Sequence, residues 1–232
     1  IKRAGKYLRS LKTQEHRYPI RFLRNVLEDC LADEFDGRDP KEQLQELTSI
    51  GPQLIGLATT VAAYLNHLEN GGCLETFKTA ETPDSVFRSF MRMALPEDTL
   101  TDDRVYTILN TYFDLLIGHG MNLSTSVLIQ TASGGGDLAN IFSSALSAFD
   151  TDNHGRAAVK AYDMLKDVAD NYGGETPRFM DAVVVKKETL WGHGHAIYKK
   201  GTDPRAEIME ILVREIRKIT TDIDLQHDID LA

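Results

Sequence analysis

The sequence predicts an all-α protein, and three observations lead to that prediction. Apolar residues recur at three- and four-residue spacing through most of the chain, and glycine and proline separate the periodic stretches. The alternation of apolar and polar residues that is typical of exposed strands is not convincing anywhere. The one β-prone run, residues 183–185, lies inside a helical pattern.

Two helices are predicted near the N-terminus. Apolar side chains recur at helical spacing over residues 22–31 and again over 54–68. The second stretch is apolar around much of its circumference, so we expect this helix to be buried. Gly71 and Gly72 end it, because glycine readily adopts the backbone conformation found at helix C-termini.

Two further helices are predicted before Gly118. Thr82 and Pro83 mark the start of the first, since a hydroxyl caps a helix and proline fits its first turn. The second begins near Asp102 and carries its apolar residues on one stripe. Gly118 ends it, and we interpret residues 119–125 as a polar segment.

The remaining helices follow a run of glycines at residues 134–136. A helix at 137–149 carries small side chains, which permit close approach between helices. Helices are also predicted at 157–168 and after Pro177, and a last amphipathic helix spans about 203–216.

The composition is ordinary for a globular chain of 232 residues, with 42% hydrophobic and 26% charged residues. The net charge is −9 and no dense basic face is visible, so we expect no nucleic-acid partner. No apolar run approaches the roughly 20 residues of a membrane span, so we expect no membrane segment. Cys30 and Cys73 lack metal-ligand spacing; we expect packing roles, a reducing compartment and no metal site.

Three of the seven histidines lie in glycine-flanked breaks between predicted helices: His119, His154 and His195. Glycine allows a tight turn and a close approach of ligand to backbone. Imidazole can donate a hydrogen bond or exchange a proton near neutral pH. A histidine that only caps a helix is the alternative at each position, but three such positions together favour a site.

The segment Gly192–Arg205 carries the most specific pattern in the chain, GHGHAIYKKGTDPR. It resembles the signature of the citrate synthase family. That signature is Gly, an aromatic or small residue, Gly, His, any residue, Ile or Val, a basic position and then Asp-Pro-Arg. Every position fits except His193, where the family usually has Phe, Tyr, Val or Ala.

Two more segments agree with the same family in the same order. Residues 119–125 resemble its His-Glu-x-Asn-x-Ser-Thr block, and residues 154–157 resemble its His-Gly-Gly-Ala block. Residues 17–20 and 62–64 look like the family's middle helices. The resemblance therefore covers nearly the whole chain.

The resemblance implies a two-lobed helical fold, with residues 1–155 in the large domain and 156–232 in the small, CoA-side domain. It also implies a chain truncated at both ends. The family's aspartate base lies in a Pro-Asn-Val-Asp block beyond the last helix, and this sequence reaches Ala232 without it. We expect Asp203, which belongs to the Asp-Pro-Arg turn, to cap the helix that follows.

The resemblance further implies a role for each residue. His154 donates to the thioester oxygen as the acyl-CoA enolises, and His195 polarises the keto carbonyl and serves as acid. His119 hydrogen-bonds the keto acid. Arg205 pairs with a substrate carboxylate, which a planar guanidinium can bind through two parallel hydrogen bonds. CoA docks on the glycine-rich backbone of Gly192, His193 and Gly194.

Three departures from the family pattern surround these residues. Gly120 replaces a glutamate beside the first histidine, and the charged run 150–153 replaces an apolar lead-in to the second. Arg156 and Ala158 replace a glycine and an asparagine after it. We expect the extra charge to alter the acyl pocket. Gly-Met-Asn after the first histidine is similar to the divergent alkylcitrate synthases of fungal secondary metabolism.

The predicted function is an acyltransferase that condenses an acyl-CoA with oxaloacetate and releases a citrate or alkylcitrate and free CoA. A methylcitrate or ordinary citrate synthase, a lyase that cleaves a citryl-type thioester, and a catalytically dead binding or scaffold protein are the alternatives.

The resemblance implies acyl-CoA as a co-substrate and no tightly bound cofactor. It implies a homodimer, for which the helices at 54–68 and 137–149 offer apolar surface. The expected location is intracellular, with the cytoplasm and the mitochondrion both open.

Overall fold

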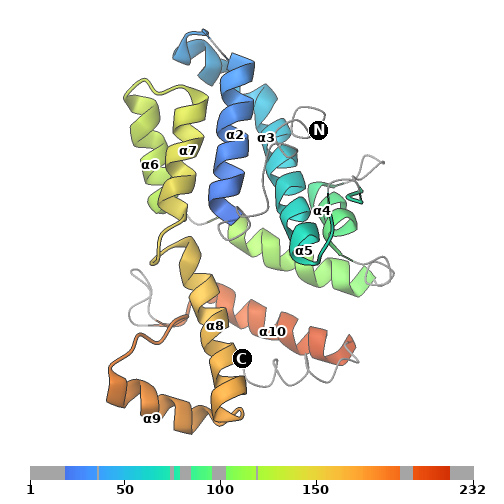
Figure 1. Ribbon diagram of the computed structural model, residues 1–232, viewed down its shortest axis with the longest axis vertical. Helices are drawn as coiled ribbons and strands as arrows, with labels where there is room; N and C mark the ends of the chain where they lie inside the picture. Colours follow the sequence, from blue (N-terminus) through green and yellow to red (C-terminus); the bar gives the residue numbers. More distant parts are fainter. Residues whose placement is uncertain are drawn as a thin grey trace. The chain divides into compact units, whose positions relative to one another are not determined.

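Figure 1 shows the computed structural model of the chain, which describes residues 19–35, 37–73, 76–78, 85–95, 103–118, 120–193 and 201–219. All regular secondary structure in these ranges is α-helical, which confirms the predicted fold class. The helices are α2 (Pro19–Phe35), α3 (Pro40–Glu69), α4 (Val86–Ala94), α5 (Asp103–Ile117), α6 (Leu123–Ser133), α7 (Leu138–Phe149), α8 (Gly155–Tyr172), α9 (Thr176–Lys186) and α10 (Pro204–Ile219).

The chain divides into two compact units. The first unit comprises residues 1–106 and 119–150, and the second comprises 107–118 and 151–232. The assignment of residues 1–155 to a large domain and 156–232 to a small one stays a prediction. None of the helices in the described part is both long and apolar enough to cross a bilayer.

The core of the first unit begins where α2 meets α3. Five buried side chains form this contact: Phe22, Val26, Val61, Tyr64 and Leu65. They recur at helical spacing on each helix, so each helix presents one apolar face to the other. Full burial of a side chain of this size contributes about 1.5–3 kcal/mol before conformational entropy is counted.

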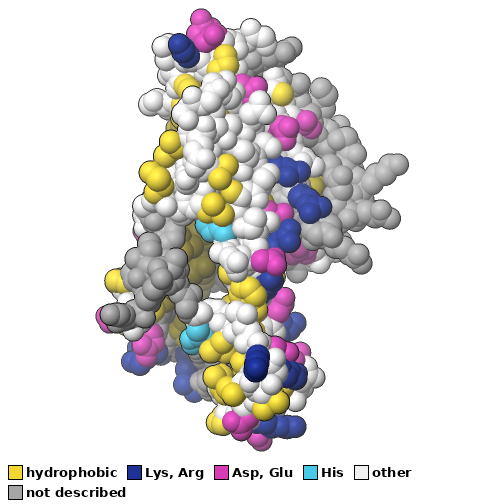
Figure 2. All heavy atoms as spheres, turned by 90° about the vertical axis from the view of Figure 1, so that its left-hand side faces the viewer, with side chains coloured by type: hydrophobic (Ala, Val, Ile, Leu, Met, Phe, Trp, Pro, Cys, Tyr) yellow, Lys and Arg dark blue, Asp and Glu magenta, His cyan; other side chains and the backbone are white. Residues whose placement is uncertain are grey.

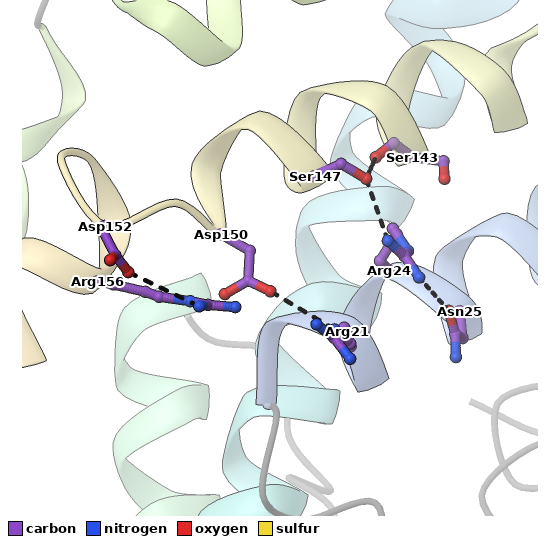
Figure 3. A network of polar contacts seen from close by, with 8 residues as sticks. All are labelled: Arg21, Arg24, Asn25, Ser143, Ser147, Asp150, Asp152 and Arg156. Carbon is purple, nitrogen blue, oxygen red and sulfur yellow. Dashed lines mark hydrogen bonds and ion pairs between the residues drawn. The ribbon is translucent and has the colours of Figure 1, made fainter.

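A second cluster joins α7 to α2 and is built from Leu31, Leu138 and Ile141. The small side chains predicted for this helix bring it close to two neighbours. Ser144 Oγ lies 2.9 Å from Thr131 Oγ1 of α6, and Ser147 Oγ accepts a 3.1 Å bond from Arg24 of α2 (Figure 3). The apolar face of α7 is therefore used inside the unit.

A buried amide fixes the start of α7 to the start of α3. The Oε1 atom of Gln43 accepts a 2.9 Å hydrogen bond from the backbone N–H of Leu138, and its Nε2 donates to the carbonyl of Arg38. The first N–H groups of a helix have no partner within it, so Gln43 satisfies a donor that would otherwise be buried without one.

The helix predicted at residues 54–68 is longer and less buried than expected. It extends over all of α3, with Asp39 as N-cap and Asn70 as C-cap, and Gly71 follows in a positive-φ conformation as predicted. Its first half also carries apolar residues at helical spacing, but Gly51 and Pro52 inside the helix are typical of a break. Ile55 is 56% exposed, so the helix is not buried around its whole circumference.

Two other helix starts differ from the prediction. Thr82 and Pro83 lie outside the described residues; the N-cap of α4 is Ser85, whose side chain accepts a hydrogen bond from the N–H of Arg88.

The residues of α6 were not predicted to form a helix. Its N-cap is Asn122, whose Oδ1 accepts a 2.9 Å bond from the N–H of Thr125, so part of the expected polar segment is a capping turn.

The two cysteines differ in environment. Cys30 is half-buried and packs against the α2–α3 core, as expected. Cys73 is exposed, and the prediction of a packing role was wrong for it. Its backbone N–H and carbonyl bond the hydroxyl of Thr76 just after α3, so this residue belongs to a turn.

The second unit has its own small core between α8 and α9. Val168, Phe179 and Val183 are buried there, and the Tyr172 and Phe179 rings meet edge to face at 5.3 Å. The run at residues 183–185 is helical, as predicted from its context. Gly173 ends α8 in the left-handed conformation (φ 59°), so only three residues separate the two helices.

Candidate functional site

His154 lies at the first turn of α8, in a tightly bonded stretch of backbone. The carbonyl of Thr151 accepts hydrogen bonds from the N–H of His154 at 3.1 Å and from that of Arg156 at 3.2 Å. His154 is the N-cap residue, yet its side chain makes no capping hydrogen bond. A pure capping role, the alternative for this histidine, is therefore not what the structure shows.

The charges that depart from the family pattern around His154 pair with each other. Asp152 Oδ1 lies 3.7 Å from Arg156 Nη1, and this pair is drawn in Figure 3. The other oxygen, Asp152 Oδ2, lies 2.8 Å from Lys160 Nζ, one turn further along α8. The hydrogen bond from Lys160 is the main reason that the pKa of Asp152 lies below its ordinary value, and the charges of Lys160 and Arg156 act in the same direction.

Asp150, the other acidic residue of the lead-in, belongs to the first unit. Its Oδ2 lies 3.9 Å from Arg21 Nε on α2, and the Asp150 side chain is only 15% exposed (Figure 3). Together with the bond between Arg24 and Ser147, this contact ties the C-terminal end of α7 to α2. Asp150, like Asp152, is thus paired with a basic side chain.

The predicted CoA-docking segment begins with a turn that packs on α8. The N–H of His193 donates to the carbonyl of Leu190 at 3.4 Å, and Gly192 has φ +84°, a conformation in which residues other than glycine are strained. A Cβ placed on Gly192 would lie 3.6 Å from Cβ of Ala161. The ring of Trp191 lies under the ammonium of Lys160, 4.3 Å from Nζ to the ring centroid.

Arg205 is the second residue of α10, and Asp203 is bonded to it three ways. Asp203 Oδ1 accepts from the backbone N–H of Arg205 at 2.9 Å, and the carboxylate also accepts from Nε at 3.0 Å and Nη2 at 2.5 Å. The capping role predicted for Asp203 is confirmed. A substrate carboxylate at Arg205 would share the guanidinium with this aspartate.

The structure thus brings together two of the predicted segments. The turn before His154 and the turn at Gly192–His193 both contact the first half of α8. His119, Gly194 and His195 lie outside the described residues, and the convergence of His119, His154, His195 and Arg205 on one cleft stays a prediction. In the part of the chain that the structure describes, no group of three His, Cys, Asp or Glu side chains could hold a metal ion.

Sequence reasoning missed Lys160 and Trp191. Asp152 and Arg156 are four residues apart, a spacing at which opposite charges meet on a helix, so this pair could have been found. Lys160 lies eight positions from Asp152, outside that spacing. The contact between Lys160 and Trp191 joins segments far apart in sequence and leaves no such signal.

A family model described as "Citrate synthase, C-terminal domain" matches residues 6–229. The citrate synthase of Corynebacterium glutamicum is 27% identical over 197 residues, which are 83% of this chain and 43% of that protein. The citrate synthase-like protein oryE of Aspergillus oryzae is 30% identical over 166 residues, 68% of this chain and 35% of that one.

Two solved structures share the fold at 19% sequence identity. Citrate synthase from Thermotoga maritima aligns with a TM-score of 0.65 over 98% of this chain and 59% of its own. Citrate synthase from Thermoplasma acidophilum, in a ternary complex with carboxymethyl coenzyme A and oxaloacetate, aligns with a TM-score of 0.71 over 97% and 56%. The chain thus spans less than half of the two relatives and somewhat more than half of the two solved chains.

Proposed function

Because the chain belongs to the citrate synthase family, we propose that it provides part of the active site of an acyltransferase that condenses an acyl-CoA with oxaloacetate. The products are a citrate or an alkylcitrate and free CoA. The observation that carries the proposal is the placement of two predicted segments on one helix. The turn that ends at the proposed thioester histidine, His154, and the turn that begins the CoA segment both contact α8.

The chemistry requires three kinds of group, and the chain has residues for each. The thioester oxygen gains negative charge as the acyl-CoA enolises, so it needs a donor already in place, which is His154. The keto carbonyl needs a donor and acid, which is His195, with His119 as a further donor to the keto acid. The substrate carboxylate needs a cation, which is Arg205.

CoA docks, in this proposal, on the backbone of Gly192, His193 and Gly194. The positive φ of Gly192 supports this assignment, because the turn that begins the segment needs a residue without a Cβ. Acyl-CoA is a co-substrate: its acyl group is transferred to the keto acid, and free CoA leaves after each turnover.

The pairing of the unusual charges favours an active enzyme over a dead scaffold protein. An unpaired aspartate and arginine beside His154 would disturb a site in which an enolate must form. Asp152 is instead neutralised by Arg156 and Lys160. An alkylcitrate-type member is proposed beside an ordinary citrate synthase because Gly-Met-Asn follows the first histidine, and the two differ in the length of the acyl substrate.

A thiol-release assay with oxaloacetate and acyl-CoAs of increasing chain length tests the proposal. We expect turnover with at least one acyl-CoA, and a loss in kcat of about 100-fold on replacing His154 by Ala, the effect of removing one oxyanion donor. Asn153→Ala is the matched control, since Asn153 is the exposed neighbouring residue. Release of thiol at the wild-type rate by the His154→Ala protein would refute the role of His154.

We also propose that the protein is a homodimer. The apolar face of α7 does not offer a dimer surface, because it is buried inside the first unit. Exposed apolar side chains lie instead at and near α6, namely Met121, Leu123 and Ile129. Hydrophobic side chains are visible on this face in Figure 2. Light scattering at micromolar concentration, on the wild type and on Leu123→Asp, tests the assignment.

A further inference from the structure

We propose that Lys160 is a positioning residue for acyl-CoA: it links the turn before His154 to the turn at Trp191–Gly192 and so holds the CoA-docking backbone in place. This inference rests on the proposed function. Lys160 touches neither substrate in the proposal, and it acts through the two turns that it joins.

The first link is an ion pair with a defined hydrogen bond. Lys160 Nζ lies 2.8 Å from Asp152 Oδ2, and the second oxygen of that carboxylate faces Arg156 at 3.7 Å. The Lys160 side chain is 33% exposed. Lysine has a flexible stem with four carbon atoms, so the carboxylate restricts it to one arrangement among many.

The second link is the contact between the ammonium of Lys160 and the ring of Trp191. Nζ lies 4.3 Å from the ring centroid, well within the distance of about 6 Å at which a cation is attracted by the face of an aromatic ring. Tryptophan gives the strongest attraction of this kind. Asp152 thereby fixes the ammonium, and the ammonium fixes the ring.

The third contact is apolar and comes from the first residue of the turn. Gly192 itself faces the next residue of α8, since a Cβ built on it would lie 3.6 Å from Ala161 Cβ. Leu190, at the start of the turn, packs against the cluster of Val168, Phe179 and Val183. The turn is thus held by the apolar packing of Leu190 and by one contact that depends on the charge of Lys160.

The charge-dependent contact predicts a separation between kinetic constants. Without the ammonium, the turn keeps its apolar contacts but samples more orientations, so the CoA-docking backbone is less often in the competent one. We expect the KM for acyl-CoA to rise about two- to fivefold, the equivalent of one exposed cation–π contact. The KM for oxaloacetate should not change, because the groups that contact the keto acid are untouched.

The single tryptophan provides a direct readout of the turn, and the affinity for CoA shows whether the turn acts on the ligand. Trp191 is the only tryptophan in the 232 residues, so the fluorescence emission of the chain reports this turn. We compare the wild type with Lys160→Met, which keeps the stem and removes the charge, and with Lys160→Arg, which restores a cation. Asp152→Asn tests the first link in the same way, should Lys160→Met fold poorly.

A control variant lies on the same helix. Lys166 also places its ammonium over an aromatic ring, that of Tyr162 at 5.9 Å, but this pair is not part of either turn. Lys166→Met should leave both the emission of Trp191 and the affinity for CoA unchanged. Circular dichroism of each variant shows whether the helices are intact.

The measurement is a titration with CoA followed by Trp191 emission and by calorimetry. We expect a shifted emission maximum and about two- to fivefold weaker CoA binding for Lys160→Met and Asp152→Asn, with recovery in Lys160→Arg. Wild-type affinity in a folded Lys160→Met protein would overturn this inference alone. A wild-type chain that does not bind CoA would overturn the proposed function and this inference with it.

Discussion

Asp203 holds Arg205 through both its main chain and its side chain. The same carboxylate caps α10 at the N–H of Arg205 and accepts two hydrogen bonds from the guanidinium, from Nε at 3.0 Å and from Nη2 at 2.5 Å. One aspartate therefore sets where the helix starts and in which direction the proposed substrate cation points.

The two functions of Asp203 can be separated by substitution. Asparagine caps a helix as well as aspartate does but cannot form the ion pair, whereas alanine does neither. We expect Asp203→Ala to lower the free energy of unfolding by about 1 kcal/mol, and Asp203→Asn to lower it by much less. Urea denaturation followed by circular dichroism measures both. Equal losses in the two variants would show that the ion pair, and not the cap, supports the helix.

Replacement of Arg205 by Leu should chiefly weaken binding of the keto acid. A buried or half-buried carboxylate without its cation loses a charge-assisted hydrogen bond, which corresponds to a rise in the KM for oxaloacetate of about 10- to 100-fold. Arg214→Leu is the control, because Arg214 is an exposed residue of the same helix that pairs with Glu210. The assignment fails if the two variants have the same KM for oxaloacetate.

The pH dependence of the Asp152 ion pair has a defined sign. The pKa of Asp152 is lowered from its ordinary value of 3.8, first by the hydrogen bond from Lys160. A carboxylate with a lowered folded-state pKa stabilises the fold above 3.8, and this contribution is lost as pH falls through the folded-state pKa. Carboxyl-carbon NMR should therefore give a pKa for Asp152 below 3.8 in the wild type.

The same titration on Lys160→Met should move the pKa of Asp152 upwards, since the largest cause of the shift is then removed. Lys166→Met serves as the reference for a change of net charge elsewhere on α8. An Asp152 pKa that is the same in Lys160→Met and in the wild type would mean that the two side chains do not pair in solution.

Gly192→Ala should destabilise the turn through backbone strain. The added Cβ meets Ala161 at an ordinary contact distance, but the φ of +84° is costly for alanine by about 1–2 kcal/mol. Gly201→Ala is a matched control, since a Cβ there meets nothing within 4 Å and its φ is unexceptional. Thermal unfolding should separate the two variants. Equal stability would mean that the turn relaxes without strain.

Much of the fold could be predicted because its helices carry apolar faces and recognisable ends. The helix at 137–149 and its N-cap follow from the glycine run and Asp137, whose side chain accepts from the N–H of Asn140. The helix α6 escaped prediction because its residues are mostly small or hydroxylated, so no apolar stripe marks it. Residues of this kind adopt a helix here because α7 packs against them.

The candidate site was predictable only where the chain itself encodes it. The capping role of Asp203 follows from its place before a proline and a helix. The part played by Lys160 does not follow, because Trp191 lies 31 positions further along and meets it only through the tertiary fold. Local patterns identify the ends of helices, whereas contacts between distant segments depend on how the helices pack.

The hydrogen bond between Gln43 and Leu138 has a consequence for the order in which the protein forms. It joins groups 95 positions apart, and the bond from Ser143 to Glu28 spans 115. Closing such long loops has to precede the gain from the contacts that they permit, and non-local contacts of this kind slow folding relative to bundles of neighbouring helices. On the ribosome, α2 and α3 emerge long before their partner. The core of the first unit therefore cannot be completed until α7 has been synthesised and released from the exit tunnel.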